Sequence, residues 1–144
     1  MERELGAMEN VFRLFNKIEP GPTKLCYIYF LSSNTPIDIG TLKDAMKILV
    51  ERHPLLRMRV QYINGKYIWR ELPFGTEMDI CVNTSNHWTT LFSESLKESF
   101  DLENGPLWGL TLMPNAESEL FDRNMRWHAA LVLRFSHTII DGQG

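Results

Sequence analysis

Apolar and polar positions recur with two different periods along the chain, and each period predicts a kind of element. Helical spacing is clearest in the segment that begins near Thr41, and Pro54 is expected to end it. Its apolar stripe consists of Leu42, Ala45, Met46, Leu49 and Val50. A stripe with this spacing has to face a sheet. A period of two follows over 56–62, and the pair Asn64-Gly65 predicts a tight hairpin into a strand over 66–72.

The remaining elements are expected from composition and from turn residues. Aromatic and β-branched residues predict strands over 24–31, 107–113 and 127–135, with a short strand over 78–82 and a second helix over 88–100. The first 18 residues approach helical spacing, although Gly6 and Asn10 weaken the pattern. Together these elements predict one domain over residues 1–144 with an α+β fold. We expect a two-layer sandwich in which a mixed, mostly antiparallel sheet carries the helices on one face.

His137 follows directly after the most apolar of the predicted strands. On a period of two, one face carries Trp127, Ala129, Leu131, Leu133 and Phe135, and His137 comes next on that face. We therefore expect the imidazole to point inward at the end of the strand, close to an opening. This position suits a proton acceptor that works near neutral pH. Taken alone, a histidine at a strand end is more often a structural residue.

Composition and charge narrow the class of function. The 144 residues have a formal net charge of -3 and no cluster of Lys and Arg between aromatic residues, so nucleic-acid binding is not expected. Cys26 and Cys81 are too few for a disulfide framework or a metal-ligand set, and we interpret them as buried thiols. The N-terminus lacks the apolar core of a secretory signal, and no apolar run approaches the ~20 residues that span a bilayer. These features predict a cytoplasmic protein without a metal site.

Three stretches, in this order, resemble one superfamily. Residues 136–142 read Ser-His-Thr-Ile-Ile-Asp-Gly and are similar to its His-His-x-x-x-Asp-Gly motif. Residues 52–57 read Arg-His-Pro-Leu-Leu-Arg and are similar to its Arg-His-x-x-Leu-Arg stretch. Residues 100–107 read Phe-Asp-Leu-Glu-Asn-Gly-Pro-Leu and are similar to its Phe-Asp-Leu…Gly-Pro-Leu turn. The chain thus resembles the N-terminal half of a coenzyme-A-dependent acyltransferase of chloramphenicol-acetyltransferase-like fold, nearest to condensation domains and alcohol acetyltransferases.

The resemblance implies a role for each residue of the last motif. His137 takes the place of the general base, which removes a proton from an acceptor hydroxyl or amine. Asp141 takes the place of a structural aspartate that orients the loop through an arginine, and Gly142 permits a tight turn. Ser136 stands where the motif has its first histidine. On the outward side of the strand, we expect Ser136 to support the loop rather than to take part in the chemistry.

Two arginines match the arginine-bearing stretch of the family. Alternation along the predicted strand puts Arg57 on its polar face, so we expect a solvated side chain there. Arg52 is therefore our candidate partner for Asp141. A partner beyond Gly144 is the alternative.

The resemblance also implies a reaction and its co-substrates. An acyl group would pass from a thioester of coenzyme A or of a carrier-protein phosphopantetheine to a small-molecule acceptor, with no tightly bound cofactor and with the cofactor-binding residues unassigned. Because the family builds its tunnel between two similar halves, residues 1–144 look like a fragment that is inactive until a C-terminal half or self-association supplies the other wall. Two alternatives stay open. One is a catalytically degenerate binding or interaction module of the same fold, and the other is an unrelated α+β domain with coincidental matches.

Overall fold

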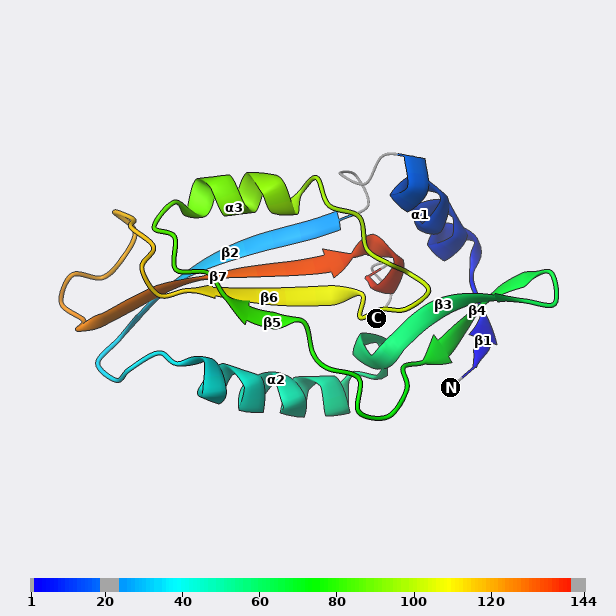
Figure 1. Cartoon of the computed structure of the whole chain (residues 1–144), viewed down its shortest axis with the longest axis horizontal. Helices are drawn as coiled ribbons and strands as arrows, with labels where there is room; N and C mark the ends of the chain where they lie inside the picture. The colour runs from blue at the N-terminus through cyan, green and yellow to red at the C-terminus, as the bar shows by residue number, and fades with distance from the viewer. Residues whose placement is uncertain (1, 19–23, 141–144) are drawn as a thin grey trace.

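The computed structural model describes residues 2–18 and 24–140, and within them two sheets, three α-helices and two 3₁₀ turns (Figure 1). In chain order the elements are β1 (Arg3–Glu4), α1 (Ala7–Ile18), β2 (Lys24–Ser33), α2 (Ile39–Arg52), η2 (Pro54–Arg57), β3 (Met58–Ile63), β4 (Lys66–Glu71), β5 (Ile80–Val82), α3 (Trp88–Ser95), β6 (Trp108–Met113), β7 (Trp127–Ser136) and η3 (His137–Ile139). The α+β class predicted from the sequence is confirmed. None of the helices in the described part of the chain is long and apolar enough to cross a membrane.

The larger sheet has the strand order β2-β7-β6-β5, and the smaller one has the order β1-β4-β3. In the larger sheet β7 is central and pairs antiparallel with both β2 and β6, whereas β5 pairs parallel with β6. The register of β2 on β7 runs from Lys24 opposite Ser136 to Ser33 opposite Trp127. Every residue of β7 therefore has a partner on β2, so the end of this strand is fixed in position just before His137.

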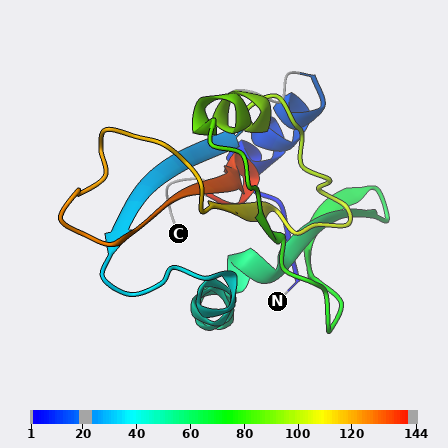
Figure 2. The same ribbon diagram turned by 60° about the vertical axis from the view of Figure 1, so that its left-hand side comes forward.

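The helices lie on both faces of the larger sheet, which corrects the prediction that they share one face. Leu110 and Leu133 belong to the apolar cluster against which Met46 of α2 packs. Val132 belongs to a second cluster, which Trp88 of α3 covers. Since neighbouring residues of a strand point to opposite sides, these clusters lie on opposite faces. Figures 1 and 2 both show α2 and α3 on opposite sides of the sheet. The reason is that the central strands are apolar on both faces, as strands covered from both sides are.

Several local predictions are confirmed, and two need correction. Helix α2 ends at Arg52, before Pro54, and the hairpin turn has positive φ at both Asn64 and Gly65. Helix α2 begins earlier than the sequence pattern near Thr41 predicted: its N-cap is Asp38, whose carboxylate accepts the N–H of Thr41 at 2.9 Å. The second predicted helix is shorter than expected and ends at Ser95.

Helix α1 turns its polar side toward the protein and its apolar side outward. Glu9, Arg13 and Asn16 are buried, and Glu9 is only 4% exposed. The outward residues are Met8, Val11, Leu14, Phe15 and Ile18. Each buried polar side chain has a partner: the Arg13 guanidinium lies 3.5 Å from the centroid of the Tyr67 ring, and Asn16 Nδ2 donates to the carbonyl of Phe100 at 3.0 Å. The polar contacts therefore decide which side of α1 faces the protein.

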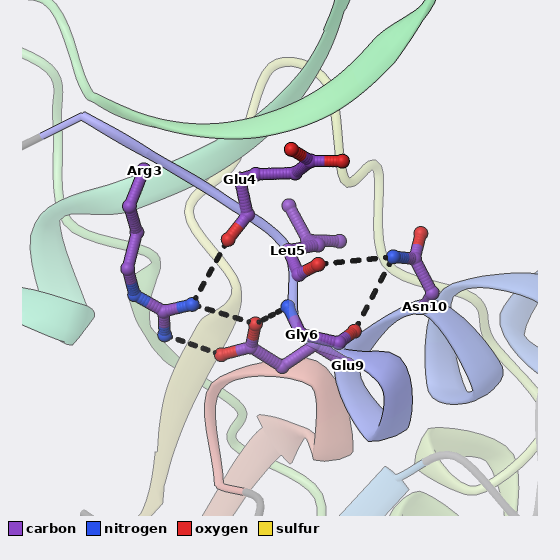
Figure 3. Close-up of polar contacts among 6 residues, drawn as sticks. All are labelled: Arg3, Glu4, Leu5, Gly6, Glu9 and Asn10. Carbon is purple, nitrogen blue, oxygen red and sulfur yellow. Dashed lines mark hydrogen bonds and ion pairs between the residues drawn. The ribbon is translucent and has the colours of Figure 1, made fainter.

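The N-terminal end of α1 is fastened by Glu9, which binds back to the residues before the helix (Figure 3). Its carboxylate accepts the N–H of Gly6 at 2.6 Å and a guanidinium N–H of Arg3 at 2.8 Å. A glutamate at this position satisfies a free N–H at the helix start and suits the positive end of the helix dipole. Burial alone would raise the pKa of the Glu9 carboxyl, but these bonds lower it below its usual value. The helix is thereby joined to β1.

We expect the Glu9 carboxylate to make part of the folding stability depend on pH. Because the folded-state pKa is below the unfolded one, the contribution is present above about pH 5 and is lost as the pH falls through the folded pKa. Glu9→Gln should lower the free energy of unfolding at pH 7 by roughly 1–2 kcal/mol and should flatten its decline on acidification. Denaturant titrations between pH 7 and pH 3 measure both effects. The matched control is Glu4→Gln, which removes an exposed ion pair to Lys66 and should change little. Equal pH curves for all three proteins would contradict this role of Glu9.

Candidate active site

His137 begins the 3₁₀ turn η3 directly after β7, and Ser136 caps this turn. The Ser136 hydroxyl oxygen accepts the N–H of Thr138 at 3.2 Å, and the N–H of Ile140 donates to the carbonyl of His137 at 3.2 Å. Ser136, Thr138 and Ile139 are all buried. The position of Ser136 on an outward strand side, expected from alternation, is wrong. By capping η3, the Ser136 side chain nevertheless supports the loop, as was expected.

The imidazole of His137 is half-buried and lies between helix α1 and its own turn. It stacks on the ring of Phe12 with a centroid distance of 4.6 Å and an interplanar angle of 13°. Its Nδ1 lies 3.3 Å from the carbonyl oxygen of Ile140. Since a carbonyl oxygen only accepts, this contact requires a proton on Nδ1, and in the neutral ring Nε2 then carries the lone pair. A neutral imidazole in this tautomer can act as a general base through Nε2.

Two predicted site residues, Asp141 and Gly142, lie outside the described residues. The pairing of Asp141 with Arg52 therefore stays a prediction. Arg52 itself is exposed at the C-terminal end of α2. Among residues 2–18 and 24–140, no three His, Cys, Asp or Glu side chains are grouped so that they could hold a metal ion. Cys26 is half-buried and Cys81 is exposed, and both are free thiols; the expectation that Cys81 is buried is wrong.

Arg57 has a structural role that the sequence pattern missed. One guanidinium N–H group donates to the carbonyls of Val50 and Glu51, at 2.7 and 2.9 Å, and Nε donates to the Glu71 carboxylate at 3.2 Å. A positive charge bound to the last carbonyls of α2 suits the negative end of the helix dipole. The prediction of a solvated strand position fails because 54–57 form a 3₁₀ turn and the strand begins only at Met58. Pro54 at the first position of this turn was the available signal.

A hollow of about 460 Å³ opens beside Arg57 on the α2 side of the larger sheet. Its lining includes Val50, Leu56, Leu72, Met78, Pro106 and Trp108. The indole N–H of Trp108 donates to the carbonyl of Leu56 at 3.0 Å, which fixes one wall. His137 does not line this hollow. Its size falls within the range of ligand pockets, but the candidate base and this space are separate features of the surface.

Arg134 of β7 lies three residues before His137 and links the strand to two neighbouring segments. Its guanidinium donates to Asp79 at 2.9 Å and to Glu98 at 3.0 Å, and these acids lie before β5 and after α3. Gly109 leaves the room for this contact, because a Cβ there would lie 2.5 Å from both the Arg134 and the Asp79 side chains. Close by, burial lowers the pKa of the Lys24 ammonium, whose Nζ donates to the Ser95 carbonyl at 2.9 Å. These contacts fix the end of β7 that precedes His137.

The chain has the fold of part of a condensation domain, as the resemblance in its sequence predicted. The starter condensation domain of rhizomide synthetase RzmA matches with a TM-score of 0.73 at 14% identity, over 96% of this chain and 34% of that one. AB3403, a four-domain nonribosomal peptide synthetase bound to AMP and glycine, matches with a TM-score of 0.75 at 14% identity, over 96% of this chain and 10% of that one. The tallysomycin biosynthesis protein TlmII matches with a TM-score of 0.69 at 16% identity, over 94% of this chain and 31% of that one.

The likeness to these structures concerns the fold. The chain spans about a third of the length of the RzmA domain and of TlmII. One RzmA structure is a complex with C8-CoA, and another holds C8-CoA together with Leu-SNAC. No protein-family model and no curated protein sequence matches the chain. Its condensation-domain fold is therefore recognised from the arrangement of its elements.

Proposed function

We propose that this chain is part of an acyltransferase that passes an acyl group from a thioester to a hydroxyl or an amine, with His137 as the general base. The observation that carries the proposal is the state of the His137 ring. At the end of β7, in a condensation-domain fold, Nδ1 is engaged by Ile140 and Nε2 is left as the proton acceptor. The ring is half-buried, and no residue in 2–18 or 24–140 hydrogen-bonds to Nε2.

The proposed chemistry needs one proton acceptor and one thioester. Nε2 of His137 takes the proton of the acceptor O–H or N–H as that oxygen or nitrogen attacks the thioester carbonyl carbon. A new C–O or C–N bond forms, the C–S bond breaks, and the imidazolium returns its proton to the departing sulfur. The products are an ester or an amide and a free thiol. General-base assistance of this kind contributes about 10²- to 10⁴-fold to the rate.

We propose coenzyme A or a carrier-protein phosphopantetheine as the carrier of the acyl group. Support comes from the RzmA structure that holds C8-CoA in the same fold. The acyl group then arrives as a co-substrate, and the chain needs no tightly bound cofactor. Asp141 and Gly142 are proposed to shape the loop behind His137, with Arg52 as the candidate partner of the Asp141 carboxylate.

The proposed enzyme is larger than these 144 residues, which would form its N-terminal half. Two uncovered apolar surfaces support this. One is the outward side of α1, where Ile18 is 77% exposed, and the other includes Tyr27 and Tyr29 of β2, which lie exposed beside Leu133 and Leu131 of β7. Patches of this kind usually mark an interface. We propose that a C-terminal half of the same fold covers them, and that residues 1–144 alone are inactive unless self-association provides that cover.

The proposal is tested with the gene product that continues past Gly144, read from its transcript. That product is expected to release free thiol from an acyl-coenzyme A or an acyl N-acetylcysteamine thioester in the presence of hydroxyl and amine acceptors, whereas the 144-residue chain should release none above the uncatalysed rate. Thiol formation followed with a chromogenic disulfide measures both. A long product that binds the thioester but never turns it over would favour the alternative, a catalytically degenerate binding module, which the replacement of the first motif histidine by Ser136 motivates. A transcript that ends at Gly144 would contradict the proposed second half.

A further inference from the structure

The candidate base is in contact with a residue from the opposite end of the chain. Phe12 lies in the middle of α1, and its ring stacks nearly parallel on the His137 imidazole, with 4.6 Å between the centroids and 13° between the planes. Helix α1 packs against the turn η3, as Figure 1 shows for the blue helix and the red turn. Phe12 itself is half-buried. The contact therefore forms where the N-terminal helix meets the end of β7.

The turn that carries His137 does not by itself fix the plane of the ring. Rotation of an imidazole about its last side-chain bond is broad, because that torsion joins an sp³ to an sp² carbon. Within residues 2–18 and 24–140 the ring makes one hydrogen bond, between Nδ1 and the Ile140 carbonyl, and at 3.3 Å it is longer than most N–H···O bonds. A flat partner packed against one face restricts the remaining freedom, because turning the imidazole out of the parallel arrangement gives up the stacked contact.

Phe12 can serve as such a partner because α1 is held by contacts that do not involve its apolar side. Glu9 binds Arg3 of β1, and Asn16 binds the carbonyl of Phe100. The Arg13 guanidinium lies over the Tyr67 ring of β4. Phe12 lies between this polar inner side and the exposed apolar side, so its ring is presented to η3 by a helix that is already fixed. The ring position is thereby tied to the smaller sheet.

We infer that Phe12 is a positioning residue for His137: its ring sets the plane of the imidazole so that Nδ1 stays on the Ile140 carbonyl and Nε2 stays available as the base. This inference rests on the proposed function, since a positioned Nε2 matters only if it accepts a proton from the acceptor. It adds a residue that the sequence motif around His137 does not contain. It also gives α1 a role at the site in addition to its place in the fold.

The test uses long-range ¹H–¹⁵N NMR of the histidine rings in the 144-residue chain. The chain has four histidines, and His137→Gln identifies the signals of His137 by their loss. The expected wild-type spectrum has His137 in one tautomer, with the proton on Nδ1, and with ring protons shifted upfield by the Phe12 ring. Phe12→Leu should remove that upfield shift and produce a mixture of tautomers, and Phe12→Tyr should restore both features.

The matched control is Phe15→Leu, which makes the same change one turn along on the exposed side of α1 and should leave the His137 signals unchanged. Circular dichroism establishes that each variant is folded; if Phe12→Leu unfolds, Phe12→Met, whose longer and more flexible side chain adapts to the space without a ring, takes its place. An unaltered tautomer and unaltered ring shifts in the folded variant would overturn the inference. In the longer gene product, Phe12→Leu should lower kcat roughly tenfold with little change in KM. Because the NMR result does not depend on turnover, a failure of the inference and a failure of the proposed function are distinguishable.

Discussion

Replacing His137 by alanine in the longer gene product is expected to lower kcat at least about a hundredfold. The physical reason is the loss of the one basic nitrogen, Nε2, that the ring leaves free when Nδ1 is engaged by the Ile140 carbonyl. Without it the acceptor has to attack the thioester while it still carries its proton. Binding of the thioester should change little, because the imidazole acts on the acceptor. Steady-state rates of thiol release at saturating thioester measure the effect.

The control for this substitution is His128→Ala on the same strand. His128 is half-buried, and its Nδ1 lies 3.2 Å from the Ser32 hydroxyl oxygen, at the far end of β7 from His137. We expect its loss to leave kcat within about twofold of the wild type, since surface and edge substitutions usually have small effects. An equal fall in both variants would indicate damage to β7 rather than loss of a base. No fall in His137→Ala would end the assignment.

The second large effect is expected from Trp108→Ala, which should lower the free energy of unfolding by about 3–5 kcal/mol. Trp108 is 1% exposed, belongs to the main apolar cluster between α2 and the larger sheet, and donates its indole N–H to the Leu56 carbonyl. The substitution opens a cavity and leaves a partly buried carbonyl without its donor. A domain of this size has about 5–15 kcal/mol in total, so the variant should be close to unfolding at room temperature.

Chemical denaturation followed by circular dichroism measures this loss, and Trp127→Ala is its matched control. Trp127 lies at the start of β7 and is 41% exposed, so its removal should cost less than about 1 kcal/mol. Similar midpoints for the two variants would show that the apolar cluster around Trp108 is not the part of the protein that determines its stability.

The elements that the sequence predicted well are those whose signals are local. Pro54 ends α2 because its ring cannot continue a helix, and Asn64-Gly65 forms the hairpin because both residues accept positive φ. The strand over 127–135 was recognisable because its residues are apolar on both faces. The same property should have predicted helices on both faces of the sheet, and the prediction of helices on one face was wrong. A strand that is apolar on both faces needs cover on both sides, and α2 and α3 provide it.

The orientation of helix α1 could not be predicted from the sequence. Its apolar residues at helical spacing predict a side that faces the protein, yet Glu9, Arg13 and Asn16 occupy that place. Their partners are Arg3, Tyr67 and the Phe100 carbonyl, and no periodicity within the helix reveals contacts so distant in sequence. An apolar stripe indicates that something covers it, but it does not say whether the cover belongs to the same chain.

The candidate site was predictable only as far as its signals are local in the sequence. The motif around His137 singles out this residue as a candidate, but strand alternation could not give the direction of its ring, because β7 ends at Ser136 and a 3₁₀ turn begins. Arg57 was assigned to a strand because the 3₁₀ turn over 54–57 was not predicted. Phe12 carries no signal of its own, since a phenylalanine in an amphipathic helix is ordinary core composition. Only the packing of α1 on η3 reveals it.

The decisive measurement is a structure of the longer gene product with a bound acceptor and a non-reactive thioester analogue. We expect Nε2 of His137 to lie within about 2.6–3.2 Å of the acceptor oxygen or nitrogen, or one water molecule away, while Nδ1 stays on the Ile140 carbonyl. An imidazole that faces bulk water, with the acceptor beyond hydrogen-bond reach of either ring nitrogen, would contradict it.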